Sequence, residues 1–91
     1  ELKTVKGHHI HINDSEQYVT IKTKGNHKIV LDDQNRKIEI KTSGGHSYEL
    51  NDSSATISIK SSGNIQIDAS GSINIKAGAN ISLKGAVIQL N

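Results

Sequence analysis

The sequence is built on a 19-residue repeat that runs three times and then gives way to a spacing of eight. The same apolar position returns every 19 residues at Leu2, Ile21, Ile40 and Ile59. From Ile59 onward the step is eight, at Ile67, Ile75 and Leu83. A fixed period indicates one structural unit stacked on itself, and one such unit cannot bury its own apolar face. The face must therefore be covered by further units, from the same chain or from other chains.

The composition argues against an ordinary small domain. The chain has 91 residues and no Phe, Trp, Met, Cys or Pro, and its only aromatic residues are two tyrosines. A chain of this length buries little of its surface, and here it has few large side chains with which to build a core. Disulfides are excluded because there is no cysteine, so oligomerisation is the support that we expect.

The charge balance does not indicate a nucleic-acid-binding protein. The chain has 11 basic and 9 acidic residues and a net charge of +2. No basic cluster is flanked by aromatic residues that could stack on bases, so we expect no nucleic-acid partner. No cofactor is required by any motif. Leu2 aligns with Ile21 in the middle of a repeat, so we expect the chain to be a piece of a longer protein.

Ten apolar pairs, each separated by one residue, run along the chain. Nine of the ten intervening residues are polar, and most of the pair members are β-branched, which predicts short strands with one buried face. These twenty residues are the predicted core of the assembly: Ile10, Ile12, Val19, Ile21, Ile29, Leu31, Ile38, Ile40, Tyr48, Leu50, Ile57, Ile59, Ile65, Ile67, Ile73, Ile75, Ile81, Leu83, Ile88 and Leu90.

Two classes of turn separate the pairs and divide the chain into two parts. Short glycine-containing turns alternate with longer polar turns until Ile59, and only short turns follow. We therefore predict a region with longer turns and 19-residue repeats over residues 1–58. A regular array with eight-residue repeats, the octads, is predicted for residues 59–91.

Strands that offer two inward side chains are too narrow to make a core alone. A single-chain β-solenoid needs about three strands per turn, so ten strands would give barely three turns with two open ends. Three intertwined chains give ten layers of three strands, and closure removes the lateral edges. We predict an all-β fold, an intertwined homotrimeric β-helix with the shape of a triangular prism. The single-chain β-solenoid stays an alternative.

The run GNIQIDASGSINIKAGANISLKGAVIQL resembles the octads of the trimeric β-helix in contractile injection machines. These include the central spike of phage T4 tails and the VgrG spikes of type VI secretion. The upstream units KGHHIHIND, GNHKIVLDD and GGHSYELND resemble the segments that precede the octads in VgrG-like proteins. The resemblance implies a structural, membrane-piercing needle and not an enzyme. It also implies a place in a phage baseplate or in a secreted contractile apparatus.

The resemblance further implies partners at both ends of the needle. One end joins the rest of the spike and the baseplate, and a small PAAR-type tip protein caps the C-terminal end. The residues expected to dock this tip are Ala86, Val87, Ile88, Gln89, Leu90 and Asn91. The sequence does not distinguish a phage tail from a secretion system or a phage-derived particle.

Two other classes of protein use similar repeats. A left-handed hexapeptide acyltransferase would need a period of six, which differs from the observed 19 and eight. The stalk of a trimeric surface adhesin usually carries coiled-coil heptads, which are absent from this sequence. The adhesin stalk stays the alternative function.

The histidines are the candidate metal ligands. His8, His27 and His46 precede their apolar pairs by two residues and share their inward parity, so a trimer could hold ions or water between rings of imidazoles. No carboxylate partner is in register. We therefore favour the alternative that they lie at the prism corner and hydrogen-bond to backbone or water. His9 and His11 resemble an iron-binding motif of some phage spike tips, but here they are expected to face outward.

Charged residues also recur with the repeat. Asp14, Asp33 and Asp52 follow an apolar pair, where their side chains are expected to bond to turn backbone. Their return in every unit indicates a scaffold role and no catalytic residues. The lysines that follow the pairs are interpreted as a solvated face that prevents association: Lys22, Lys41, Lys60, Lys76 and Lys84.

Overall fold

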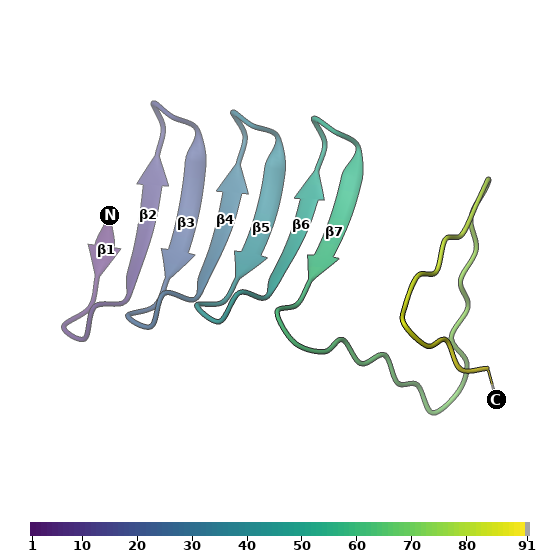
Figure 1. Ribbon diagram of the computed structural model, residues 1–91. Helices are drawn as coiled ribbons and strands as arrows, with labels where there is room; N and C mark the ends of the chain where they lie inside the picture. Colours follow the sequence, from purple (N-terminus) through teal and green to yellow (C-terminus); the bar gives the residue numbers. More distant parts are fainter. Residues whose placement is uncertain (91) are drawn as a thin grey trace.

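The computed structural model describes residues 1–90, of which the first two-thirds form one antiparallel sheet (Figure 1). Each strand pairs with the next strand along the chain, in the order β1 to β7. The strands are β1 (Leu2–Lys3), β2 (His9–Asn13), β3 (Tyr18–Lys22), β4 (Lys28–Asp32), β5 (Lys37–Lys41), β6 (Ser47–Asn51) and β7 (Thr56–Lys60). The predicted all-β class and the first six apolar pairs as strands are confirmed.

The register places all apolar pair residues of the sheet on one face, which we call the apolar face. Each apolar residue lies opposite an apolar residue of the next strand, as Ile29 does with Ile40 and Leu31 with Ile38. Two continuous rows result. One row consists of Leu2, Ile10, Ile21, Ile29, Ile40, Tyr48 and Ile59. The other consists of Ile12, Val19, Leu31, Ile38, Leu50 and Ile57. The intervening residues make the opposite, polar face.

Short turns join the strands along one edge of the sheet, at residues 4–8, 23–27 and 42–46. We call them the Thr–His turns. In the last of them, the amide of Thr42 donates to the carbonyl of His46 at 3.0 Å, and the amide of His46 donates to Thr42 Oγ1 at 3.4 Å. The third residue after each threonine has a left-handed backbone, with φ of 95° at Gly45 and 67° at Asn26. Glycine and asparagine adopt this conformation at the least cost.

Longer turns join the strands along the other edge, at residues 13–18, 32–37 and 51–56. We call these the long turns. The side-chain oxygens of Asn13, Asp32 and Asn51 each accept the amide three residues later, at 2.9, 3.0 and 3.1 Å. This role was expected of Asp14, Asp33 and Asp52, so that prediction is wrong by one residue. The first residue of a turn has the side-chain reach to close it.

Successive long turns are joined by the main chain. The amide of Asp33 donates to the carbonyl of Gln17, and the amide of Asp52 donates to the carbonyl of Arg36, both at 2.9 Å. These bonds use the very residues whose side chains were expected to close the turns. The long-turn edge is therefore a stacked ladder that continues the hydrogen bonding of the sheet.

The strands pair within one chain, where the sequence predicted pairing between chains. Each hairpin turn brings the next strand to hydrogen-bonding distance at low entropic cost, so local pairing forms first. Regular structure ends at Lys60, so β7 spans the boundary predicted between residues 58 and 59. The apolar spacing changes from 19 to eight at Ile59, one residue before the pairing ends.

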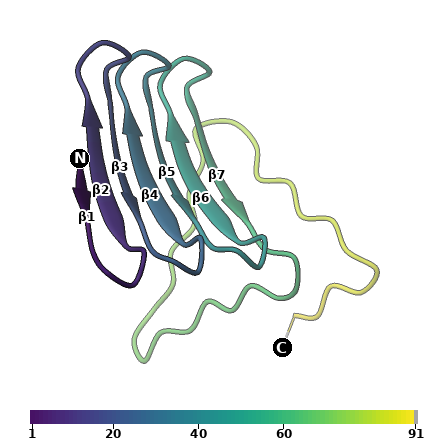
Figure 2. The same ribbon diagram turned by 90° about the vertical axis from the view of Figure 1, so that its left-hand side faces the viewer.

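Residues 61–90 have no assigned strands in this single chain. The apolar pairs of the octads lie in extended segments that run past β7 and turn back (Figures 1 and 2). Strands were expected at these four pairs, from Ile65/Ile67 to Ile88/Leu90. A lone chain gives them no antiparallel neighbour, because the short links between octads do not form hairpins. Asn91 lies outside the described residues.

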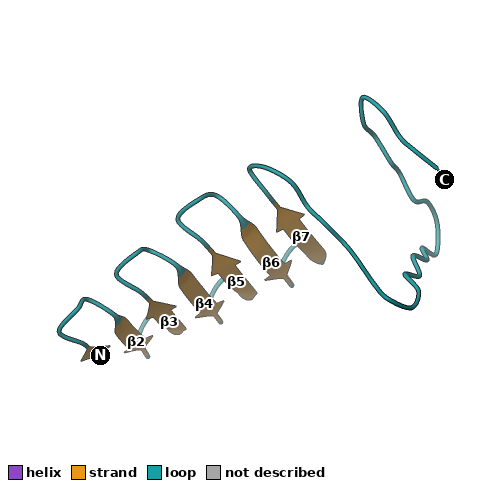
Figure 3. Cartoon of the chain, turned by 90° about the horizontal axis from the view of Figure 1, so that it is seen from below, coloured by secondary structure: helices purple, strands orange, loops and turns teal. Residues whose placement is uncertain are grey.

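Neither face of the sheet is covered by another layer. Viewed from below, the strands stand in a single row with the turns bending away from it (Figure 3). Within residues 1–90 no side chain, apolar or polar, is buried. The core must therefore come from outside the single chain.

Candidate assembly surface

The apolar face of the sheet is exposed over its whole length. Ile29 and Ile12 are 38% and 63% exposed, and the other residues of both rows are exposed too, except Val19 and Leu50, which are half-buried. The polar face is the more covered of the two, since its long side chains lie over one another: the Glu39 side chain is 12% exposed. This inverts the usual pattern of a globular protein, so the apolar face is an assembly surface.

The apolar pairs of the octads extend this surface beyond the sheet. Their exposure is as high as that of the sheet residues, and Ile67 is 72% exposed. Burying one Ile or Leu contributes about 1.5–3 kcal/mol. In the single chain none of the apolar pairs is buried, so none of them makes this contribution in full.

The three repeated histidines lie in the Thr–His turns and bond to backbone. The Nδ1 atom of His8 accepts the amide of Lys24 at 3.2 Å, and that of His27 accepts the amide of Ser43 at 3.3 Å. His46 Nδ1 accepts the amide of Ser62 at 3.4 Å. Each histidine thus joins its own turn to the next one along the edge, which is the arrangement favoured over a metal site. The ladder stops there, because the next position in the 19-residue step is Ile65.

The structure places no metal-binding group at the remaining histidines. Within the part of the chain that the structure describes, no three His, Cys, Asp or Glu side chains come together. His11 lies on the polar face with its Nδ1 3.3 Å from a carboxylate oxygen of Glu1, without hydrogen-bond alignment. Its ring is tilted by 42° against that of Tyr18, with centroids 5.5 Å apart.

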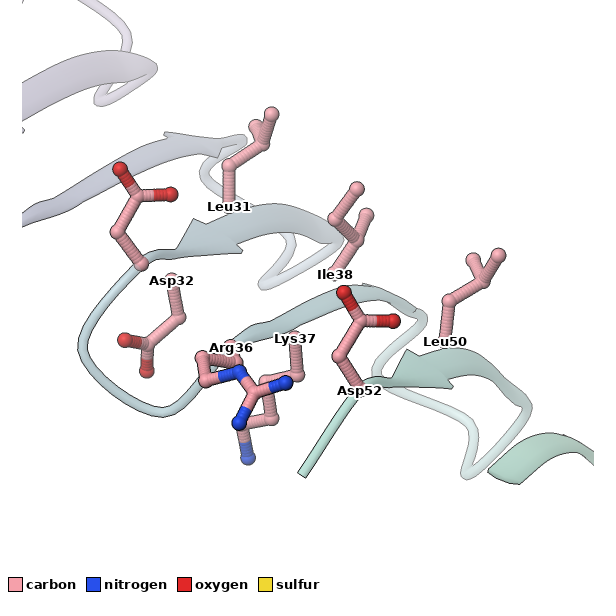
Figure 4. Close-up of a pocket in the computed structure, with 8 residues that line it drawn as sticks. Leu31, Asp32, Arg36, Lys37, Ile38, Leu50 and Asp52 are labelled. Atoms are coloured by element: carbon pink, nitrogen blue, oxygen red, sulfur yellow. The ribbon is translucent and has the colours of Figure 1, made fainter. Parts of the chain in front are cut away.

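Shallow hollows lie where the apolar rows meet the long turns. One is lined by Leu31, Ile38 and Leu50 together with charged turn residues (Figure 4). The equivalent hollow one repeat earlier contains Ile12, Val19 and Asp14. The hollows return with the 19-residue repeat, as the predicted scaffold role of Asp14, Asp33 and Asp52 requires.

One turn carboxylate has a perturbed acidity. The pKa of Asp32 is lowered below its usual value of 3.8, first by the hydrogen bond from the Asn35 side chain and then by that from the Asn35 amide. The two bonds measure 2.9 and 3.0 Å. They stabilise the ionised form and so tie the geometry of this turn to the charge of Asp32.

The comparison with known families agrees with an assembly surface. The family described as the phage baseplate V C-terminal trimerisation domain matches residues 18–91. The chain belongs to this family. No curated protein sequence matches it.

As a phage baseplate V C-terminal trimerisation domain, the chain has a structural role in a virion baseplate and forms a homotrimer. The family match covers β3–β7 and the octads, which carry most of the exposed apolar residues. Among the described residues there is no helix of the length and hydropathy that a membrane crossing needs. Baseplate, trimer and structural protein are therefore confirmed, and the type of spike stays a proposal.

Sequence reasoning missed two kinds of structural residue in this trimerisation domain. The side chains that close the long turns belong to Asn13, Asp32 and Asn51, and they could have been found from their position as the first turn residue. The threonine Oγ1 atoms that accept the histidine amides could have been found from the Thr-x-x-x-His spacing, which recurs with the 19-residue step.

Proposed function

We propose that three copies of this chain form the needle of a VgrG-like central spike in a contractile injection machine. The needle is a triangular prism, each chain contributing its sheet β1–β7 as one face and its octads to an intertwined end. The machine drives the prism mechanically through a target envelope. No chemical step is involved. The alternative function, the stalk of a surface adhesin, is less favoured because the matched family is a phage baseplate family.

One observation carries this proposal. The exposed apolar residues form two unbroken rows along the sheet and continue at the octad pairs, with none of them buried in the single chain. Three such surfaces facing one axis would bury every layer and leave the polar faces in water. A continuous narrow core of Ile and Leu gives the stiffness that a piercing part needs.

The C-terminal end is proposed to hold a PAAR-type tip. The described part of the predicted docking segment, residues 86–90, is apolar at four of its five positions, and Val87 and Leu90 are 78% and 90% exposed. Val87→Asp should prevent capture of the tip protein by the trimer. Gln66→Asp, on an outward position away from the end, should leave capture unchanged. Equal capture by both variants would remove the tip from the proposal.

Blunting the end tests the needle function itself. A globular domain is fused to the C-terminus of the spike through a linker that contains a protease site. The fused spike is then tested as part of assembled particles. Assembly, seen by electron microscopy, should be normal, while breach of the target envelope, measured as release of a periplasmic enzyme, should be lost. Protease treatment before contact should restore the breach. Unchanged breach by blunted particles would show that the domain only holds the baseplate together.

A further inference from the structure

The two edges of sheet β1–β7 carry opposite charge. The edge with the Thr–His turns, residues 3–9, 22–28, 41–47 and 60–62, has no acidic residue. It contains Lys3, Lys6, Lys22, Lys24, Lys28, Lys41 and Lys60. The edge with the long turns, residues 13–18, 32–37 and 51–56, contains more acidic than basic side chains. These are Asp14, Glu16, Asp32, Asp33 and Asp52, against Arg36 and Lys37.

Most of these edge charges have no ion-pair partner in their own chain. Within residues 1–90 the ion pairs of the sheet involve only two carboxylates, those of Glu1 and Glu39, and both lie on the central part of the strands or beside it. Asp14, Asp33 and Asp52 are exposed and form none. The Asp52 carboxylate projects to the same side of the sheet as Leu31, Ile38 and Leu50 (Figure 4). It therefore faces the side from which another copy must approach.

Threefold symmetry brings unlike edges together. If each sheet is one face of a prism, rotation about its axis sets the long-turn edge of one copy against the Thr–His edge of the next. A meander also places its turns at alternate heights, since the long turns join β2–β3, β4–β5 and β6–β7 and the Thr–His turns join the strands between. Each long turn thus stands level with the gap between two Thr–His turns of its neighbour.

We infer that complementary charge between these two edges closes the corners of the trimer and fixes its direction. Asp14, Asp33 and Asp52 of one copy meet the lysines of the Thr–His edge of the next copy, with Lys6 and Lys24 in the turns themselves. A copy packed upside down would set like edges together, which is unfavourable. The lysines interpreted from sequence as preventing association would thereby promote it in one arrangement only. This inference rests on the prism proposed above.

Two charge-reversed chains test the corners. An acid-reversed chain carries Asp14→Lys, Asp33→Lys and Asp52→Lys. A base-reversed chain carries glutamate at the five lysines of the Thr–His edge that form no ion pair within residues 1–90, as Lys6→Glu, Lys22→Glu, Lys24→Glu, Lys28→Glu and Lys60→Glu. Each should lose stability as a trimer at low salt, and a chain with all eight substitutions should recover it, because the two edges then again carry opposite charge. Glu49→Lys, in the centre of the polar face, is the control for a change of charge alone.

Refolding an equal mixture of the two reversed chains shows whether the effect acts between copies. Mixed trimers have two matched corners, whereas trimers of one kind have none. Native mass spectrometry should find trimers of one kind depleted at least about tenfold below the quarter of all trimers that binomial mixing gives, and high salt should reduce the depletion.

Two outcomes would overturn the inference. Binomial mixing, or a chain with all eight substitutions that is no more stable than the two reversed chains, would mean that the edges do not pair between copies, although a trimeric mass would leave the prism intact. A monomeric wild-type chain would instead remove the prism itself.

Discussion

The Nδ1 atom of His27 accepts a hydrogen bond from the amide of Ser43, 16 residues further along the chain and 3.3 Å away. The bond crosses from one Thr–His turn to the next. It requires a ring nitrogen that carries no proton, so the ring proton of neutral His27 resides on Nε2. A residue that resembles a metal ligand in sequence is thus a structural acceptor.

Removal of this acceptor should loosen one turn only. His27→Leu is expected to destabilise each chain by about 0.5–1.5 kcal/mol, because the Ser43 amide loses its protein partner. Hydrogen exchange followed by NMR should show the Ser43 amide exchanging faster, with the Lys24 and Ser62 amides unchanged. His9→Leu, outside the ladder, is the control. A Ser43 amide that stays protected in His27→Leu would contradict the assignment.

Inward and outward positions of one octad should respond very differently to charge. Ile67→Asp would place three carboxylates together in an apolar layer, at a cost of several kcal/mol for each buried charge, so the trimer should be lost. Gln66→Asp lies on the other side of the same segment and should change stability by no more than about 0.5 kcal/mol. Light scattering reads the result as a mass of one or three times 9.8 kDa. Equal effects would show that the assumed parity is wrong.

Adjacent glycines in the third Thr–His turn provide a matched pair. Gly45 has a φ of 95°, and a Cβ there would lie 3.5 Å from Ser62 Cβ, so the cost of Gly45→Ala is conformational rather than steric. We expect a loss of about 1–2 kcal/mol per chain. Gly44 is outside the left-handed region, and Gly44→Ala should be neutral or slightly stabilising. Denaturant unfolding of the two variants measures the difference, and a neutral Gly45→Ala would contradict the turn geometry.

Acid should destabilise the middle long turn before its neighbours. The pKa of Asp32 is lowered in the folded chain, so the unfolded chain binds this proton more readily. The contribution is complete above the usual value of 3.8 and is lost as the pH falls through the lower folded value. The equivalent residues Asn13 and Asn51 do not titrate. Asp32→Asn should therefore flatten the decline of the unfolding midpoint below about pH 4, and parallel profiles would show that Asp32 contributes nothing.

The strands of the first 60 residues were predictable because alternation of apolar and polar residues determines both the strand and its faces. Ile29 and Leu31 fall on one face of β4 and Val30 on the other, as the period of two requires. The partner of each strand was not predictable. The spacing of Ile29 and Ile40 is the same whether they pair within one chain or between two, and only the turn geometry decides.

The role of the histidines was predictable only as one of two alternatives. Parity places His27 beside the apolar face, but its acceptor bond depends on where the next turn returns, and that is a property of the stacked turns. The opposite charge of the two edges was likewise invisible in the net charge of +2, because the alternation of turns sorts lysines from aspartates. In the octads, the alternation of apolar and polar residues predicts strands, but residues 61–90 form none in the single chain.

The meander that places neighbours in sequence next to one another in the sheet has a consequence for the evolution of length. Each 19-residue unit adds two strands, or about 10 Å, and leaves the width of the face as it was. Duplication or loss of a whole unit would keep the parity, the alternation of turns and the cross-section. The length of the sheet can therefore change by whole repeats through recombination. The remaining repeats would need no change in sequence.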